Sequence, residues 1–219
     1  MFIPLKDDNP PVTFPLVTIG LILANGWVFF HQISLDVVES QRFIFQWGAI
    51  PHQLVTGQTL YGPSPVPVYF TLLSSMFLHG GFLHLFGNNI EDALGHFRFL
   101  LFYLFCGLCA ALVQVFSTPG STVPMIGASG AVAGVLGAYL LLFPTARILT
   151  LFFIIIIVKL IRLPAIIVLG FWFFLQLMGV MGGSVSNVAF FAHVGGFVAG
   201  MILVKIFQPQ RSKSRRRWA

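Results

Sequence analysis

The chain has 219 residues, of which 57% are hydrophobic, 15% aromatic and only 8% charged. Soluble domains carry roughly 25% charged residues, so this composition excludes a soluble globular protein and indicates a membrane protein with several spans. Most of the net charge of +6 lies in a C-terminal tail, residues 208–219. We interpret this tail as a cytoplasmic anchor beside anionic lipid, because no aromatic or glycine pattern favours nucleic-acid binding.

The first spanning candidate comprises residues 15–30 and can extend through His31, since a bilayer needs ~20 residues of helix. The preceding residues 1–14 contain no small-residue cleavage site, so we expect a retained cytoplasmic N-terminus rather than a signal peptide. The polar, Gly/Pro-rich residues 33–67 then predict a long external loop, with enough apolar side chains to lie partly in the membrane interface.

Further apolar segments predict spans two, three and four at residues 68–90, 99–116 and 128–143. The next stretch, residues 147–180, is ambiguous, because it can hold one long helix, two spans, or an interfacial piece followed by one span. Keeping Arg147, Lys159 and Arg162 in the cytoplasm satisfies the positive-inside rule. This choice favours a segment that dips in and returns, residues 148–163, and then a fifth and a sixth span at residues 164–180 and 188–207.

The sequence therefore predicts an all-α membrane protein whose residues 15–207 form a bundle of six transmembrane helices, with both termini in the cytoplasm. Spans four and six run in the same direction in this topology. Ser129 lies near the outer end of span four, and His193 lies about a turn and a half below the start of span six. The two side chains are expected at similar depth.

Ser129 and His193 indicate a catalytic site. Polar side chains inside a membrane are costly and mark functional sites, and a serine with a histidine is the minimum set for nucleophilic catalysis. No acidic residue follows Asp92, so a triad carboxylate from the C-terminal half is excluded. If the pair works together, it works as a dyad.

Glycines on both helices can bring the pair together. Gly127, Gly130 and Gly134 lie on one side of span four, and Gly196 and Gly200 share a face with His193. Small residues four apart let transmembrane backbones approach closely, so a short Ser–His contact is expected. The alternative is an ordinary helix-packing motif with an incidental serine.

Span two contains His84 and Asn88, which share a helix face. Neutral hydrogen-bond donors at this spacing suit an oxyanion hole, whereas zinc ligation is disfavoured because there is no HExxH motif and no suitably spaced carboxylate. Cys106 and Cys109 form a CxxC inside an apolar run with no second pair, so we interpret them as small apolar side chains. No metal and no other cofactor is expected.

Four motifs together carry a family resemblance: FLHGGFLH at residues 77–84, EDALGH at 91–96, GASG at 127–130 and AHVGG at 192–196. With these motifs the chain resembles the rhomboid family of intramembrane serine proteases, in its bacterial form. The resemblance implies that Ser129 is the nucleophile and His193 its general base, and that His84, Asn88 and the Ser129 backbone N–H stabilise the oxyanion. It also implies that residues 181–187 form a cap that gates substrate entry.

The chain departs from the family pattern after Asn88, where the acidic pair of the second motif follows almost at once. The stretch from Gly81 to Gly95 has 15 residues, or roughly 22 Å of helix against a hydrocarbon core of ~30 Å. We interpret this as a deletion in the second transmembrane helix. Asn88 then belongs either to the oxyanion site or to the turn before the acidic pair.

The resemblance implies an intramembrane serine endopeptidase that cleaves transmembrane segments of partner membrane proteins in the bacterial inner membrane. The alternative is a catalytically impaired or inactive rhomboid-like protein that binds membrane-protein clients. Intact Ser129 and His193 argue against this alternative, and the shortened second helix argues for it. A transporter is disfavoured because the spans lack paired charges.

Overall fold

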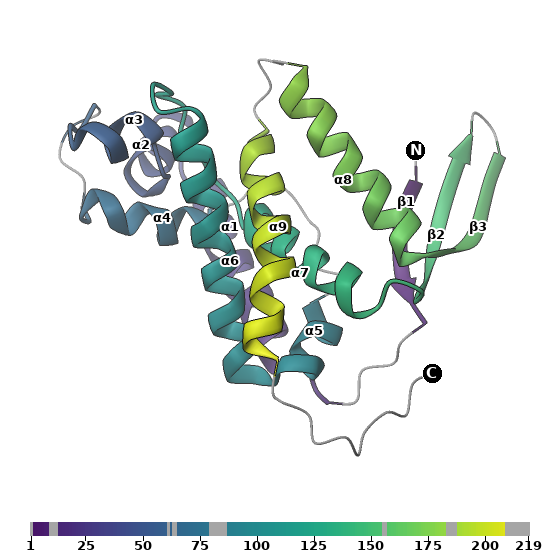
Figure 1. Ribbon diagram of the computed structural model, residues 1–219. Coiled ribbons are helices and arrows are strands. Elements are labelled where there is room, and N and C mark those ends of the chain that lie inside the picture. Colours follow the sequence, from purple (N-terminus) through teal and green to yellow (C-terminus); the bar gives the residue numbers. More distant parts are fainter. Residues whose placement is uncertain are drawn as a thin grey trace.

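The computed structural model describes residues 2–8, 13–60, 62, 65–78, 87–154, 157–182 and 188–208, without the side chains of residues 2–7, 87, 88 and 152–158. It is mostly helical, as expected (Figure 1). Three helices form the centre: α6 (His96–Ser117), α7 (Ser129–Leu142) and α9 (Phe190–Phe207). Each of the three packs against the other two.

The helices α1 (Leu16–Ser34), α6 and α9 are long and apolar enough to cross a membrane. Shorter apolar helices lie at Val68–Phe77, at α7 and at α8 (Ala165–Met181). Several of these helices are apolar on nearly all sides, as expected for helices that face lipid as well as protein. The chain is therefore an integral membrane protein, and the predicted boundaries of five of the six segments agree with α1, α6, α7, α8 and α9 to within a few residues.

The predicted second span, residues 68–90, is not one helix. Short helical turns η1 (Val68–Phe70), α4 (Thr71–Ser74) and η2 (Ser75–Phe77) end at Leu78, whose backbone is extended. A helix begins again at α5 (Gly87–Leu94). Eight residues of helix span about 12 Å, much less than the ~30 Å of a hydrocarbon core. Residues 79–86, which include His84, lie outside the described part of the chain.

A three-stranded antiparallel sheet corrects the all-α prediction. Its strands are β1 (Phe2–Asp7), β2 (Arg147–Ile154) and β3 (Ile157–Pro164), in the order β1-β2-β3. The hairpin strands are rich in Ile, Leu, Val and Phe, most of which favour strands, but an unbroken apolar run does not separate a strand from a helix by periodicity. Figure 1 shows the sheet beside the start of α8.

The hairpin returns the chain to its starting point, as predicted for residues 148–163. Arg147 and Pro164 are register partners at its base. The N-terminal strand joins the same sheet, and Asp8 forms an ion pair with Arg162 at 3.6 Å, between the carboxylate Oδ2 and the guanidinium Nε. The N-terminal residues and two of the cations that were assigned to the cytoplasm therefore lie together.

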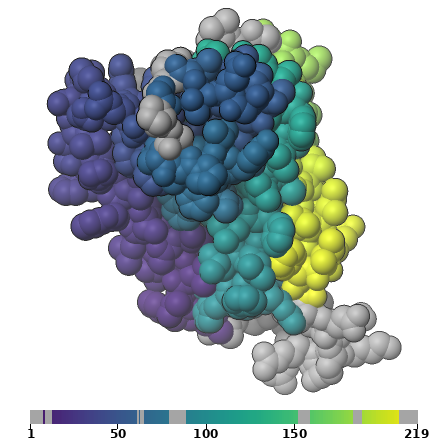
Figure 2. Space-filling model, turned by 90° about the vertical axis from the view of Figure 1, so that its left-hand side faces the viewer, coloured from purple at the N-terminus to yellow at the C-terminus, as the bar shows by residue number. Residues whose placement is uncertain are grey.

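The predicted external loop, residues 33–67, contains two helices, α2 (Val37–Trp47) and α3 (Pro51–Thr56). Asp36 caps α2 by accepting hydrogen bonds from the backbone N–H groups of Val38 and Glu39, both at 2.9 Å. In Figure 2 the blue residues of this loop gather at one end of the molecule, and the purple start of α1 lies toward the other.

Glu91 of α5 holds the start of α1. Its carboxylate accepts hydrogen bonds from the backbone N–H groups of Val17 and Thr18, both at 2.8 Å, and from the Thr18 hydroxyl at 2.7 Å. The residue is 1% exposed. A carboxylate at this place satisfies N–H groups that have no partner within the helix and lies at the positive end of the helix dipole. The acidic motif after span two thus joins α5 to the first helix.

Glu91 also predicts a pH dependence of stability. Burial alone would raise the pKa of this carboxyl, but the hydrogen bonds from Thr18, Val17 and His96 outweigh it, so the pKa lies below its ordinary value. Because the native pKa is lowered, the ionised Glu91 carboxylate stabilises the folded protein at pH values above its pKa in the unfolded chain, about 4.3. This stabilisation is lost as the pH falls through the native pKa. We expect Glu91→Ala to lower the free energy of unfolding by roughly 2–4 kcal/mol at pH 7 and by less at pH 3.

Denaturant unfolding of the detergent-solubilised protein at the two pH values measures this difference. Glu39 offers a control, because it forms an exposed ion pair with Arg42, and Glu39→Ala is expected to cost less than about 0.5 kcal/mol at either pH. An equal effect of Glu91→Ala at pH 7 and pH 3 would contradict the capping role.

Candidate active site

Ser129 is the first residue of α7, at the end of a sharp turn. The turn contains Gly127, whose φ of +115° is a backbone conformation that residues with side chains rarely adopt. The Gly127 N–H donates to the Ser75 carbonyl at 2.8 Å, which fixes the turn against η2. A Cβ atom at Gly127 would lie 3.7 Å from the Ser129 Oγ. Glycine therefore both permits the turn and keeps the space beside the exposed serine side chain open.

His193 lies in the first turn of α9, and its Nε2 is 2.8 Å from the Ser129 Oγ. The two residues are 64 positions apart in the sequence, and the structure brings them together at the matching ends of two helices that run in the same direction. A nucleophile and its base need a heavy-atom distance of about 2.6–3.2 Å. The distance observed here lies within that range.

Direct backbone contact between α7 and α9 makes the short distance possible. A Cβ atom added to Gly196 would lie 2.1 Å from the carbonyl oxygen of Gly130, and one added to Gly200 would lie 1.9 Å from that of Gly134. Any side chain there would push the two helices apart. Four glycines that the sequence predicted between these helices therefore lie where α7 and α9 cross: Gly130, Gly134, Gly196 and Gly200.

The third helix at this site is α8, which contributes Gln176 and Trp172. The His193 Nδ1 is 2.9 Å from the Gln176 Oε1, and the Trp172 ring packs against the imidazole with centroids 6.0 Å apart. Neither residue was predicted from the sequence. The available signal was Gln176, a lone amide in an otherwise apolar helix, because polar side chains at such positions mark functional sites.

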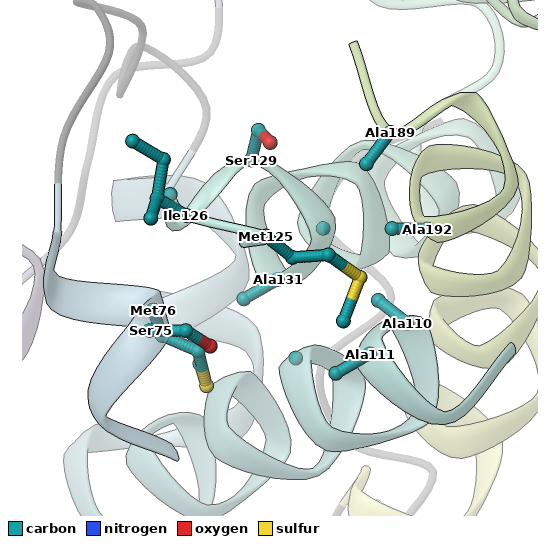
Figure 3. A pocket seen from close by; sticks show the side chains of 13 residues that line it. Ser75, Met76, Ala110, Ala111, Met125, Ile126, Ser129, Ala131, Ala189 and Ala192 are labelled. Atoms are coloured by element: carbon teal, nitrogen blue, oxygen red, sulfur yellow. The ribbon is translucent and has the colours of Figure 1, made fainter. Parts of the chain in front are cut away.

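A small cavity of about 30 Å³ adjoins Ser129. Its walls are built mainly from alanine, glycine and methionine, and include Ala110 and Ala111 of α6 and Ala192 of α9. Figure 3 shows these alanines on the far side of the cavity from Met76 and Ser75, with Ser129 at the edge. Such a space admits water or a small apolar side chain.

The described part of the structure does not include the side chains of the two predicted oxyanion donors. His84 lies outside it, and for Asn88 only the backbone, in α5, is described. One further donor set is present: the first N–H groups of α7, whose N-cap Ala128 supplies no side-chain cap. These groups lie at the positive end of the helix dipole, where anions are stabilised.

Among the described residues, no group of three or more His, Cys, Asp and Glu side chains is placed to hold a metal ion. Cys106 is buried and Cys109 half-buried, and neither forms a disulfide. A Cβ atom added to Gly134 would lie 2.5 Å from the Cys106 Cβ, so Cys106 packs closely against the backbone of α7. Cys106 therefore packs α6 against α7 as a small apolar side chain.

Comparisons with known proteins agree with the motifs. The family model described as the rhomboid domain matches residues 67–210. RHOMBOID-like protein 5 of Arabidopsis thaliana is 29% identical over 92% of this chain and 72% of its own length. Rhomboid protease GluP of Bacillus subtilis is 33% identical over 60% of this chain but only 25% of its own length.

A second Bacillus subtilis relative, putative rhomboid protease YdcA, is 32% identical over 58% of this chain and 62% of its own length. The bacterial matches therefore cover little more than half of the chain, whereas the match to the plant protein covers nearly all of it. The family model covers the helices that carry Ser129, Gln176 and His193. The chain belongs to the rhomboid family.

Proposed function

We propose that the chain is an intramembrane serine endopeptidase in which Ser129 is the nucleophile and His193 the general base. The observation that carries this proposal is the 2.8 Å contact between the Ser129 Oγ and the His193 Nε2. Family membership supports it, since one bacterial relative is named a rhomboid protease and a second a putative one.

The reaction follows from this geometry. The Ser129 Oγ attacks the carbonyl carbon of the scissile peptide bond, and the His193 Nε2 accepts the hydroxyl proton. The oxyanion that forms is stabilised by the Ser129 backbone N–H at the start of α7, with His84 and Asn88 as proposed further donors. The imidazolium then protonates the leaving amine, and a second cycle with water in place of serine releases the acyl product.

The proposed topology has six spans, which are α1, residues 68–90, α6, α7, α8 and α9 in chain order. Both termini lie in the cytoplasm of the bacterial inner membrane, on the side of the sheet formed by β1, β2 and β3. The starts of α7 and α9 then lie toward the outside, where water reaches Ser129. Pairing of the N-terminal strand with β2 supports a common side for the N-terminus and the basic hairpin.

The substrates in this proposal are transmembrane segments of partner proteins. The carbonyl groups of a helix are hydrogen-bonded, so a segment must unwind locally before the serine can attack it. Gly, Pro or polar residues in the segment favour such unwinding. The nearby cavity adds a size limit to the side chain beside the scissile carbonyl.

Cleavage should therefore favour a small residue at that position. We expect kcat/KM for a transmembrane peptide with alanine before the scissile bond to exceed that for phenylalanine by at least ~10-fold, because a benzyl group would crowd the closely packed Ala and Met side chains that line the space beside Ser129. Rates for a peptide pair that differs only there measure the preference. Equal rates would contradict a role of the cavity in binding the substrate.

Cleavage of a fluorogenic transmembrane peptide by the purified full chain in liposomes tests the function. A second form with residues inserted after Asn88, to lengthen α5, is assayed in parallel. Cleavage by either form that is lost in Ser129→Ala supports the protease. Peptide binding without cleavage by both forms would contradict it and would favour the client-binding alternative.

A further inference from the structure

We infer that Gln176 is a positioning residue for the proposed dyad: its amide oxygen accepts the Nδ1–H of His193 and so directs the imidazole lone pair at Ser129. The catalytic meaning of this contact rests on the proposed function, whereas the contact itself does not. The two atoms, Gln176 Oε1 and His193 Nδ1, are 2.9 Å apart. The residue is 9% exposed, so water does not compete freely for the bond.

The need for such a residue follows from the chemistry of imidazole. A neutral histidine carries one ring proton, and Nε2 can accept a proton from serine only when that ring proton is on Nδ1. In a triad a carboxylate fixes this tautomer. No Asp or Glu follows Asp92 in this sequence, and the carboxylate of Glu91 is held at the start of α1. At the His193 Nδ1 the acceptor is instead the neutral amide oxygen of Gln176.

The orientation of the Gln176 amide is fixed by its other end. Its Nε2 donates to the backbone carbonyl of Trp172 at 3.3 Å, one helical turn earlier in α8. A carbonyl oxygen can only accept, so the NH₂ group must face Trp172 and the Oε1 must face His193. In the opposite amide orientation, the Gln176 Oε1 would face the Trp172 carbonyl oxygen, which is also an acceptor. The NH₂ group would face the His193 Nδ1–H, which is also a donor in the tautomer that leaves Nε2 free to accept the serine proton.

The result is a directed chain of three hydrogen bonds. The Ser129 hydroxyl donates to the His193 Nε2, the His193 Nδ1–H donates to the Gln176 Oε1, and the Gln176 amide donates to the Trp172 carbonyl. Its first bond links α7 to α9, and its second links α9 to α8. The Trp172 ring covers one side of the imidazole and also packs against Phe197, so α8 restrains the plane of the ring as well as its tautomer.

Nitrogen NMR of ¹⁵N-histidine-labelled protein tests the inference without any substrate, because protonated and unprotonated ring nitrogens resonate in separate regions. The His193 signals are identified by their loss in His193→Gln. We expect the Nδ1–H tautomer in the wild-type protein and in Gln176→Glu, which keeps an acceptor oxygen. We expect its loss, or a mixture with the Nε2–H form, in Gln176→Leu and in the unbranched Gln176→Met.

Kinetics provide the second measurement. The bond to Gln176 is made to a charged imidazolium during the reaction, so its removal should lower kcat by roughly 10- to 100-fold with KM within about threefold of the wild type. Gln114→Leu is the matched control. It removes a glutamine that accepts the backbone N–H of Ala192 at 3.1 Å and so also links a neighbouring helix to α9, but it should leave the His193 tautomer unchanged.

An Nε2–H tautomer in the wild-type protein would overturn the inference, as would an unchanged Nδ1–H tautomer in both Gln176→Leu and Gln176→Met. These NMR results do not depend on whether the proposed protease function is correct. A wild-type protein that shows the Nδ1–H tautomer but cleaves no peptide would contradict the protease and leave the positioning contact supported.

Discussion

Ser129→Ala is expected to lower kcat/KM for a transmembrane peptide by at least ~10³-fold, and His193→Ala by a similar factor. Alanine removes the attacking oxygen in the first case and the proton acceptor 2.8 Å away in the second. Because the two side chains act as one unit, the double variant should be no slower than either single one. Steady-state cleavage in liposomes measures all three.

Ser117→Ala is a suitable control for these rates, since Ser117 is an exposed serine at the end of α6 and should behave as the wild type. Additive losses in the double variant would contradict a cooperating pair. Full activity in His193→Ala would show that another group accepts the proton.

Gly200→Ala is expected to destabilise the protein by roughly 3 kcal/mol or more and to abolish cleavage, although the residue does not contact the dyad. The added methyl carbon would lie 1.9 Å from the carbonyl oxygen of Gly134, and backbone atoms cannot move aside as a flexible side chain can. The helices α7 and α9 must separate, and this lengthens the distance from Ser129 to His193. Thermal unfolding in detergent and peptide cleavage report the two effects.

Gly170→Ala supplies the comparison within another apolar helix. Nothing lies within 4 Å of a Cβ atom at Gly170, so alanine there should be neutral or stabilise the helix by about 0.5–1 kcal/mol. If Gly200→Ala unfolds at the same temperature as Gly170→Ala, the close crossing of α7 and α9 is not what holds the site together.

The sequence predicted the helices that are long and apolar, because length and composition determine whether a segment can cross a bilayer. It also predicted that Ser129 and His193 lie at matching helix ends and that glycines lie between the helices. The hairpin at residues 147–164 was wrongly included in an all-α fold. Its apolar run lacks an alternating pattern, and its pairing with β1 depends on residues that are far apart in the sequence.

The roles of Gln176 and Glu91 could not be predicted from the sequence, because both roles depend on tertiary contacts. Gln176 is 17 positions from His193, and Glu91 is 73 from Thr18, so no local motif indicates either pairing. The second span was predicted as continuous because its apolar residues extend past Leu78, where the backbone becomes extended. Hydropathy indicates which segments are apolar enough to lie in a membrane, but it does not indicate where a helix ends inside the protein.

Labelling with a fluorophosphonate tests the nucleophile itself, because the probe forms a covalent bond with an activated serine and needs no peptide substrate. Mass spectrometry of the labelled protein is expected to find the adduct on Ser129 and to find much less of it in His193→Ala, where no base activates the hydroxyl. Labelling that persists unchanged in Ser129→Ala, or an adduct on a different residue, would contradict the assignment of Ser129 as the nucleophile.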